Sequence, residues 1–300
     1  MLALSTRGSL LSTSTAAGAR IAVVGGLLES TVNQLRVAKR LAPRRGASLR
    51  ERFGRLDDRL VFIIGSPRSG TTFLAGAIGS LPGFVDLGEV ASVKACVPAL
   101  AALGPEEAAR RLRWILAVAR RVGLVGAVRP VEQTPEMAFL IRAIPLAYPD
   151  ALVVHIVRDG RDVVCSLLEK PWLQREQTKV DDAGVPYGTY ARFWVEADRR
   201  EEFETASDAR RAAWVWRTYL TAAREAQSAI EIRYEEMTAD PQRVGEELAR
   251  RLDVPPEPLV AALAPVHVSS VGRYRTDLAT EQLAEVEDEA GSLLRGLGYV

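Results

Sequence analysis

The sequence predicts an α/β fold in which a parallel sheet is covered by helices on both faces. Residues 60–65 and 151–157 are short apolar runs with the length and composition of buried strands. Segments with helical character, at 70–80 and 161–170, follow each run within a few residues. Strands that alternate with helices form parallel sheets, because a helix carries the chain back to the edge where the next strand begins.

Further helices are expected between and after these strands. The segment 105–123 begins with a proline and two acidic residues, which are typical of a helix N-terminus. The segment 206–229 carries Trp214 and Trp216 among small and charged residues, and we interpret these aromatic side chains as part of the core. Helices are also expected at 88–103 and 135–147.

A glycine-bounded loop follows the first strand directly. Gly65 and Gly70 enclose four residues, the Gly-x4-Gly spacing of a P-loop, and a helix begins next. Backbone N–H groups and the positive end of a helix dipole both face an anion in such a loop. A nucleoside-triphosphate P-loop continues with Lys and Ser/Thr, whereas this chain has Thr71 and Thr72, and its cation, Arg68, lies inside the loop. The loop therefore predicts a site for a different phosphate-like group.

The second strand ends in Arg158, and Ser166 follows eight residues later in the next helix. With these two motifs the chain resembles the sulfotransferases that use 3′-phosphoadenosine 5′-phosphosulfate (PAPS). In that family a loop of the Gly-Ser-Pro-Arg-Ser-Gly-Thr-Thr type holds the 5′-phosphosulfate. An Arg at the end of a later strand and a Ser eight residues on hold the 3′-phosphate.

The resemblance extends over residues 60–300. Residues 230–237 resemble the family's late strand and its Tyr-Glu turn, residues 271–278 its basic loop over the nucleotide, and residues 297–299 its usual end. Phe73 lies where the family often has an aromatic residue that stacks on adenine. The nucleotide site that the resemblance implies consists of Gly65, Ser66, Pro67, Arg68, Ser69, Gly70, Thr71, Thr72, Phe73, Arg158, Ser166, Tyr234, Arg273, Tyr274 and Arg275.

The implied reaction moves a sulfuryl group in line from PAPS to a hydroxyl of a small molecule, glycan or glycolipid. The protein's task is then to position the reactants and to stabilise charge. Arg68 is the residue expected to meet the charge that develops on the bridging oxygen of the leaving phosphate. No metal is expected, because there is no γ-phosphate to hold with Mg²⁺ and the two histidines, His155 and His267, lie far apart in the sequence.

The acceptor hydroxyl needs a general base, a contribution of roughly 10²–10⁴ in rate. Many cytosolic members of the family use the His of a Lys-Thr-His segment, but residues 132–135 of this chain read Glu-Gln-Thr-Pro. Other branches, including tyrosyl-protein and carbohydrate sulfotransferases, use a Glu, and Glu89 resembles it. Glu89 is the first candidate for the base, Glu132 the second and His267 the third. Gln133 stands where the family usually has the Lys.

Two alternatives remain. A P-loop kinase or NTPase would use the end of the strand at 153–157 to bind Mg²⁺, although Thr71 in the lysine position is against it. A protein that binds a 3′,5′-bisphosphate nucleotide without turnover would be consistent with Gln133 in place of the Lys.

Composition excludes several other classes of function. A net charge of +1 over 300 residues gives no global field for nucleic acid or an anionic membrane. Two cysteines, Cys96 and Cys165, make no disulfide framework, so a reducing, cytoplasmic compartment is expected.

The chain is expected to have one main domain, residues 60–300, and an N-terminal extension, residues 1–59. Within the extension, an apolar stripe beginning at Ile21 is either a helix that contacts a membrane or a second copy of the chain, or a helix that packs on its own domain. Residues 171–205 show no periodicity and contain many aromatic residues. We interpret them as an insertion that forms a lid or an acceptor pocket, with a surface excursion as the alternative.

Overall fold

The computed structural model describes residues 48–170, 173, 192–226 and 229–300. The expected helix around Ile21 and most of the expected lid at 171–205 lie outside the described residues. The N-terminal extension is therefore described only from Ser48, where α2 (Leu49–Phe53) begins with a capping box between Ser48 and Glu51.

Five parallel strands form the sheet, in the order β2-β3-β1-β4-β5. They are β1 (Val61–Ile64), β2 (Phe84–Asp86), β3 (Arg129–Glu132), β4 (Leu152–Val157) and β5 (Ile230–Arg233). The central strand β1 is fully buried, and its side chains alternate between two cores. Phe62 and Ile64 belong to one core, whereas Val61 and Ile63 belong to the other. This alternation confirms the predicted parallel sheet with helices on both faces.

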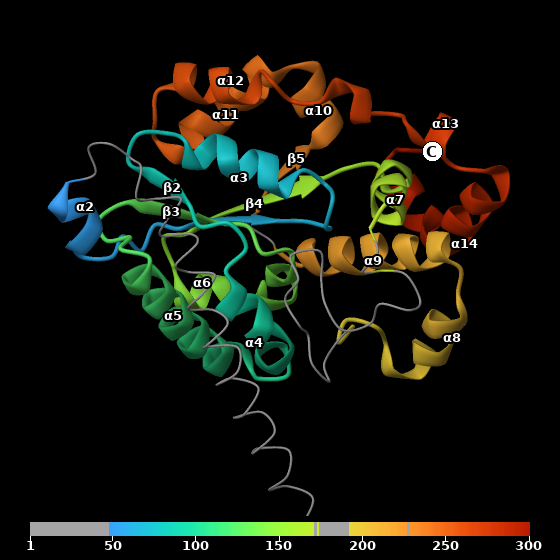
Figure 1. Ribbon diagram of the computed structural model, residues 1–300, viewed down its shortest axis with the longest axis horizontal. Helices are drawn as coiled ribbons and strands as arrows, with labels where there is room; N and C mark the ends of the chain where they lie inside the picture. The colour runs from blue at the N-terminus through green and yellow to red at the C-terminus, as the bar shows by residue number, and fades with distance from the viewer. Residues whose placement is uncertain (1–47, 171–172, 174–191, 227–228) are drawn as a thin grey trace, which may run out of the picture.

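Helices cover both faces of the sheet, and a further group of helices lies at one end of it (Figure 1). The upper layer in Figure 1 contains α3 (Thr71–Gly79), α10 (Tyr234–Ala239), α11 (Pro241–Leu252) and α12 (Pro256–Leu263). The lower layer contains α4 (Ala91–Ala101), α5 (Pro105–Val122), the 3-10 helix η1 (Pro135–Leu140) and α6 (Ile144–Ala147). At the right, α7 (Gly160–Leu168), α9 (Asp208–Ala223) and α14 (Thr280–Gly296) build a third core. Shorter elements are η4 (Ala197–Arg199), α8 (Arg200–Thr205), η5 (Val268–Ser270) and α13 (Tyr274–Asp277).

Trp214 and Trp216 are fully buried in this third core, which confirms their predicted packing role. Within the part of the chain that the structure describes, no helix combines the length and the apolar character required to cross a bilayer.

One predicted helix is wrong in its extent. Instead of a continuous helix over 135–147, the chain forms η1, a turn in which the N–H of Ala143 bonds to the carbonyl of Leu140, and the single-turn helix α6. The reason is Pro145, the second residue of α6. In a continuous helix its ring would clash with the carbonyl of Ile141, and its missing N–H would remove a hydrogen bond.

Two strands, β2 and β3, were not predicted from the sequence. Both are short, and β3 contains Pro130, which usually argues against an interior strand. The structure accommodates Pro130 because register pairing between β3 and β1 begins one residue later, at Val131 opposite Val61. Toward β2, the N–H of Arg129 and the carbonyl of Val131 form the hydrogen bonds.

Candidate active site

The loop between β1 and α3 has the tight backbone geometry of an anion-binding loop. Gly70, which caps α3, has a φ of 101°, and Arg68 has a φ of 71°, an uncommon value for a residue with a side chain. A Cβ atom on Gly70 would lie 2.8 Å from Cδ2 of Tyr234, and one on Gly65 would lie 2.6 Å from the carbonyl oxygen of Ile156. Both glycines are therefore required by the close approach of neighbouring residues. Strain of the kind seen at Arg68 concentrates at functional sites.

The structure joins the two predicted motifs through hydrogen bonds. Nε of Arg68 donates to Oγ of Ser166 at 3.0 Å, and Nη1 of Arg158 donates to the carbonyl oxygen of Arg68 at 3.1 Å. Nη2 of Arg158 donates to the carbonyl of Ser270, and the guanidinium lies 4.6 Å from the ring centre of Tyr234. Nε of Arg158 is buried and has no hydrogen-bond partner among the described residues. Segments far apart in the sequence thus meet at the guanidinium of Arg158. Its Nε remains able to donate a hydrogen bond to a ligand.

The other residues of the loop differ in their exposure. Four residues of the loop are buried: Ser66, Pro67, Ser69 and Thr71. They would contribute to an anion site through backbone groups and through the side of the loop that faces inward. Thr72 is exposed in the first turn of α3, where its hydroxyl is available to a ligand. Phe73 is half-buried and packs against the core shared by α3 and α11, so the described contacts give it a packing role.

The strand end that carries Arg158 is held from two sides. Nε1 of Trp216 donates to the carbonyl oxygen of Arg158 at 3.1 Å, and the N–H of Asp159 donates to Oε1 of Glu235 at 2.8 Å. The hydroxyl of Tyr299 donates to Oε2 of the same Glu235 at 2.9 Å. Burial raises the pKa of Glu235. No sequence motif indicates the connection of Asp159, Glu235 and Tyr299, because these residues are far apart along the chain.

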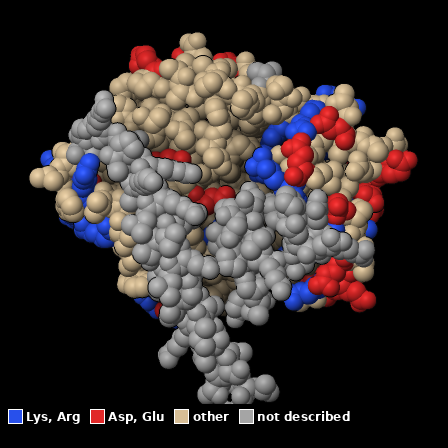
Figure 2. Space-filling model, in the orientation of Figure 1, with Lys and Arg blue, Asp and Glu red and all other residues tan. Residues whose placement is uncertain are grey.

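The late loop is anchored to α7 by one buried carboxylate. Asp162 accepts hydrogen bonds from the N–H of Gly272 at 2.7 Å and from the N–H of Tyr274 at 3.0 Å. Figure 2 shows basic and acidic side chains interspersed where α7 and α13 lie. The predicted closing loop therefore lies beside the second motif.

The side chains of that loop are already engaged. Arg273 donates to Asp277 at 2.7 Å and to Glu169 at 2.5 Å, and these hydrogen bonds raise the pKa of its guanidinium. The guanidinium of Arg275 stacks over the ring of Tyr274 at 4.9 Å. A contact between either arginine and a nucleotide stays a prediction. For Arg273 it requires exchange of its present carboxylate partners.

Glu132 ends β3 next to the P-loop strand, and its Cα pairs in register with that of Phe62. The Glu132 side chain is completely buried, and its Oε1 accepts hydrogen bonds from the backbone N–H and the hydroxyl of Thr134. Burial raises the pKa of Glu132 to about 8, and the hydrogen bonds from Thr134 lower this pKa in part. Glu132 is therefore mainly protonated at neutral pH and inaccessible to an acceptor, two properties that disfavour it as the base. Gln133, also buried, follows it.

Glu89 follows β2 at the same edge of the sheet, and 23% of its side chain is exposed. Its Oε2 forms an ion pair with Nζ of Lys94, a buried residue of α4. The same ammonium lies 3.9 Å from Oε1 of Glu136. Sequence reasoning did not select Lys94 as a site residue. The available indication was a single charged residue in the otherwise apolar helix 91–101.

His267, the third candidate, is exposed, and its carbonyl oxygen accepts a hydrogen bond from the hydroxyl of Tyr234 at 3.1 Å. The backbone of His267 thus holds the side chain of Tyr234 in place. No described side-chain contact connects its imidazole with Glu89 or Arg68.

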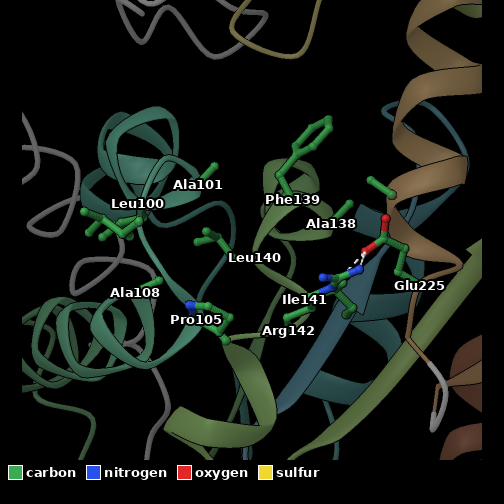
Figure 3. A pocket seen from close by; sticks show the side chains of 13 residues that line it. Leu100, Ala101, Pro105, Ala108, Ala138, Phe139, Leu140, Ile141, Arg142 and Glu225 are labelled. Atoms are coloured by element: carbon green, nitrogen blue, oxygen red, sulfur yellow. Dashed lines mark hydrogen bonds and ion pairs between the residues drawn. The ribbon is translucent and has the colours of Figure 1, made fainter.

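A separate pocket lies between α4, η1 and the adjacent ends of α5 and α9 (Figure 3). Its volume is about 300 Å³, and two of its lining residues, Arg142 and Glu225, form an ion pair at 3.1 Å. None of its lining residues belongs to the P-loop or to a strand end. This cavity is therefore distinct from the converged motifs.

Comparison with known families decides the classification. A model of the sulfotransferase family matches residues 108–258, half of the chain. The chain belongs to the sulfotransferase family. The matched stretch contains Arg158, Ser166 and Tyr234, and the P-loop precedes it. This confirms the family predicted from the two motifs and indicates a transferase of sulfuryl groups. No protein among the curated sequences matches the chain.

A solved structure agrees in fold with this sulfotransferase. The sulfotransferase domain from the curacin biosynthetic pathway aligns with a TM-score of 0.52 at 15% identity, covering 80% of this chain and 98% of that domain. Sulfotransferase STF9 from Mycobacterium avium aligns with a TM-score of 0.49 at 14% identity, covering 91% of this chain and 84% of that one. The first of these likenesses supports the α/β architecture.

Proposed function

We propose that this sulfotransferase transfers the sulfuryl group of PAPS to a hydroxyl of a small-molecule, glycan or glycolipid acceptor, with Glu89 as the general base. The observation that carries the proposal is the convergence of Arg68, Arg158 and Ser166 at the N-terminus of α3.

The donor groups of the site suit a nucleotide with two separate anionic groups. The backbone N–H groups of the loop and the start of α3 favour one anion, which we assign to the 5′-phosphosulfate. Arg158, with its unpartnered Nε, and Ser166 favour a second anion, which we assign to the 3′-phosphate. Among the described residues, no group of His, Cys, Asp and Glu side chains is arranged to hold a metal ion.

In the proposed reaction, a bond forms between the acceptor oxygen and sulfur while the bond from sulfur to the phosphate oxygen breaks. The acceptor proton passes to a carboxylate oxygen of Glu89. Arg68 stabilises the negative charge that develops on the leaving phosphate. Glu89 fits the role of base better than Glu132, because it is partly exposed and ion-paired, whereas Glu132 is buried and protonated at neutral pH.

The test of the base is Glu89→Gln, with Glu132→Gln and His267→Asn as matched variants. We expect Glu89→Gln to lower kcat by ~10² or more and to leave the affinity for adenosine 3′,5′-bisphosphate nearly unchanged. His267→Asn is expected to retain turnover. Wild-type turnover by Glu89→Gln would exclude Glu89 as the base, and a comparable loss in His267→Asn would transfer the role to that residue.

The test of the donor is calorimetric titration with adenosine 3′,5′-bisphosphate, ADP and ATP–Mg²⁺ in parallel. We expect tight binding of the bisphosphate and a large loss of affinity without its 3′-phosphate. A preference for ATP–Mg²⁺ would instead favour a kinase-type site. Bisphosphate binding without transfer to any acceptor would favour a nucleotide-binding protein without turnover.

The same proposal includes a reducing, cytoplasmic setting for the reaction. Cys96 and Cys165 are both free and buried. Free thiols are typical of proteins kept in such a compartment.

A further inference from the structure

Most of the large apolar side chains that remain exposed belong to neighbouring helices. Among the described residues, eight large hydrophobic side chains are exposed, and six of these belong to α2, α5, α6 or the turn after α5. Single exposed apolar side chains are normal on a protein surface, whereas a group of them marks a contact surface. The six side chains are Leu49, Phe53, Trp114, Val122, Leu124 and Leu146.

Hydrogen bonds join the three helices into one surface. The N–H of Gly126, just after α5, donates to the carbonyl of Glu51 in α2 at 2.7 Å. In the middle of α5, Nη1 of Arg113 donates to the carbonyl of Ala147, the last residue of α6, at 2.6 Å. α5 therefore connects α2 with α6.

The helix α2 presents its apolar side chains to solvent. Leu49 and Phe53 are four residues apart, so they lie on the same face of the helix, and they are 76% and 62% exposed. No residue of α2 is buried. Most helices in proteins are stabilised by packing of an apolar face, but α2 is held by its capping box and by the bond from Gly126. Its apolar face is thus available to a partner.

The same surface is basic. The side chains of Arg50, Arg52 and Arg55 form no hydrogen bond or ion pair with any described residue. In the sequence from 36 to 55, eight residues are Lys or Arg and only Glu51 is acidic. Figure 2 shows basic side chains at the left edge of the molecule, where α2 lies in Figure 1. The net charge of +1 for the whole chain therefore coexists with a strong local excess of positive charge.

An anionic lipid bilayer fits this combination better than other partners do. Guanidinium groups bind lipid phosphates, while Trp, Phe and Leu side chains enter the boundary between headgroups and acyl chains. A second copy of the chain on the same surface would bring like charges together. A nucleic acid would bind the arginines through its phosphates but would leave the aliphatic side chains uncovered.

We propose that the docking surface, formed by the six exposed apolar side chains and by Arg50, Arg52 and Arg55, binds the protein to an anionic membrane. The three arginines contact the lipid headgroups, and Leu49, Phe53 and Trp114 enter the boundary of the acyl chains. This inference goes beyond sulfuryl transfer and does not depend on it.

Docking in this way leaves the candidate active site open. α2, α5 and α6 each precede a strand, namely β1, β3 and β4, so the docking surface lies toward the edge at which these parallel strands begin. The P-loop and Arg158 follow the strand ends, at the opposite edge of the sheet. A docked molecule therefore turns its candidate active site toward the aqueous phase.

The experiment measures co-sedimentation of the full-length protein with vesicles of phosphatidylcholine alone and of phosphatidylcholine mixed with phosphatidylserine. We expect binding to the mixed vesicles only, and weaker binding at high salt, which screens the charges. Each basic residue near an anionic bilayer raises the partition coefficient about fivefold, so Arg50→Gln combined with Arg55→Gln should lower it by roughly 25-fold. The control combines Arg200→Gln with Arg295→Gln, which removes the same charge from exposed side chains of α8 and α14, far from α2 (Figure 1). The control should bind as the wild type does.

A second pair of substitutions tests the apolar contribution. Leu49→Ser combined with Phe53→Ser should lower the partition coefficient by about tenfold or more and leave Tm unchanged, because no residue of α2 is buried. Val300→Ser, which replaces an exposed apolar side chain at the C-terminus, should bind as the wild type does. Brominated lipids in the mixed vesicles should quench the tryptophan fluorescence of the wild type. The quenching should decrease in Trp114→Phe, because the other described tryptophans are buried.

Four results would overturn the proposal. The first is absence of wild-type binding to the mixed vesicles, and the second is an equal loss of binding in the two arginine pairs, which would assign the effect to net charge. The third is tighter binding to duplex DNA than to the mixed vesicles, which would assign the arginines to a nucleic acid. The fourth is self-association without vesicles that Leu49→Ser combined with Phe53→Ser abolishes, which would assign the surface to a second copy of the chain. Sulfuryl transfer is measured separately with PAPS, so its failure is distinguishable from each of these results.

Discussion

Gly70→Ala is the sharpest test of how the loop between β1 and α3 is built. The alanine would adopt a φ near 101°, and its Cβ would lie 2.8 Å from Cδ2 and 3.0 Å from Cε2 of Tyr234. The Tyr234 ring cannot move away easily, because its hydroxyl bonds to the carbonyl of His267 and Arg158 stacks on its face. Gly70→Ala therefore combines backbone strain with a side-chain clash.

The magnitude follows from these two costs. A non-glycine residue in a sparsely populated backbone region costs about 1–3 kcal/mol. Overpacking costs about 1–3 kcal/mol more. We expect a loss of about 3 kcal/mol in the free energy of unfolding, measured by urea denaturation. Affinity for adenosine 3′,5′-bisphosphate should also fall, because the loop must shift to relieve the contact with Tyr234.

Two further variants separate the costs. Gly76→Ala is the matched control within α3, because a Cβ there meets nothing within 4 Å, and it should be neutral or stabilising by up to about 1 kcal/mol. In a double-mutant cycle with Tyr234→Ala, the clash disappears and only the backbone strain remains. If Gly70→Ala were as stable as the wild type, or if the cycle showed no coupling, the packing argument would be refuted.

Two other predictions concern the strand ends. Arg158→Lys should weaken binding of adenosine 3′,5′-bisphosphate by about tenfold or more in calorimetry, because one charged hydrogen bond contributes about 1.5–3 kcal/mol. Arg121→Lys is the control, because it replaces an exposed guanidinium that also donates to a carbonyl. It should leave that affinity unchanged, and an equal loss of affinity in this variant would contradict the role of Arg158. For Glu132, the pKa is raised from 4.5 to about 8 in the folded state, so its stabilising contribution is complete below about pH 4.5 and is lost as the pH rises through 8. Urea denaturation should therefore show the stability of Glu132→Gln improving relative to the wild type between pH 5 and 8; a constant difference would be inconsistent with the raised pKa.

The elements predicted best from the sequence are those with continuous apolar character. β1 and β4 are buried on both faces, so their composition alone marks them. β2 and β3 could not be predicted in this way, because both are short. In addition, β3 contains Pro130, which usually argues against a strand and is tolerated here because the pairing of β3 with β1 begins one residue later. The break between η1 and α6 depends on Pro145, which lacks an N–H and cannot continue a helix that begins at Pro135.

The candidate site was predictable where a local motif fixes the spacing of its residues. The loop at 65–72 and the pair of Arg158 and Ser166 have fixed spacings, and the structure brings them together through Arg68. Lys94 could not be selected in this way, because Glu89 and Glu136, two carboxylates near its ammonium, come from separate segments of the fold. The same holds for Tyr299, whose bond to Glu235 exists only after β5 has paired with β4. Spacing rules describe local geometry, whereas these contacts depend on tertiary assembly.

The link from Tyr299 through Glu235 to Asp159 has a consequence for biosynthesis. The strand end that carries Arg158 is translated long before its last supporting side chain, and at common elongation rates the interval is on the order of ten seconds. During that interval the nascent chain already contains the P-loop but lacks the contacts that complete the neighbouring strand end. A newly made molecule therefore acquires the complete support of this strand end only when translation has passed Tyr299. A ligand of the proposed nucleotide site could then assist folding only late in synthesis.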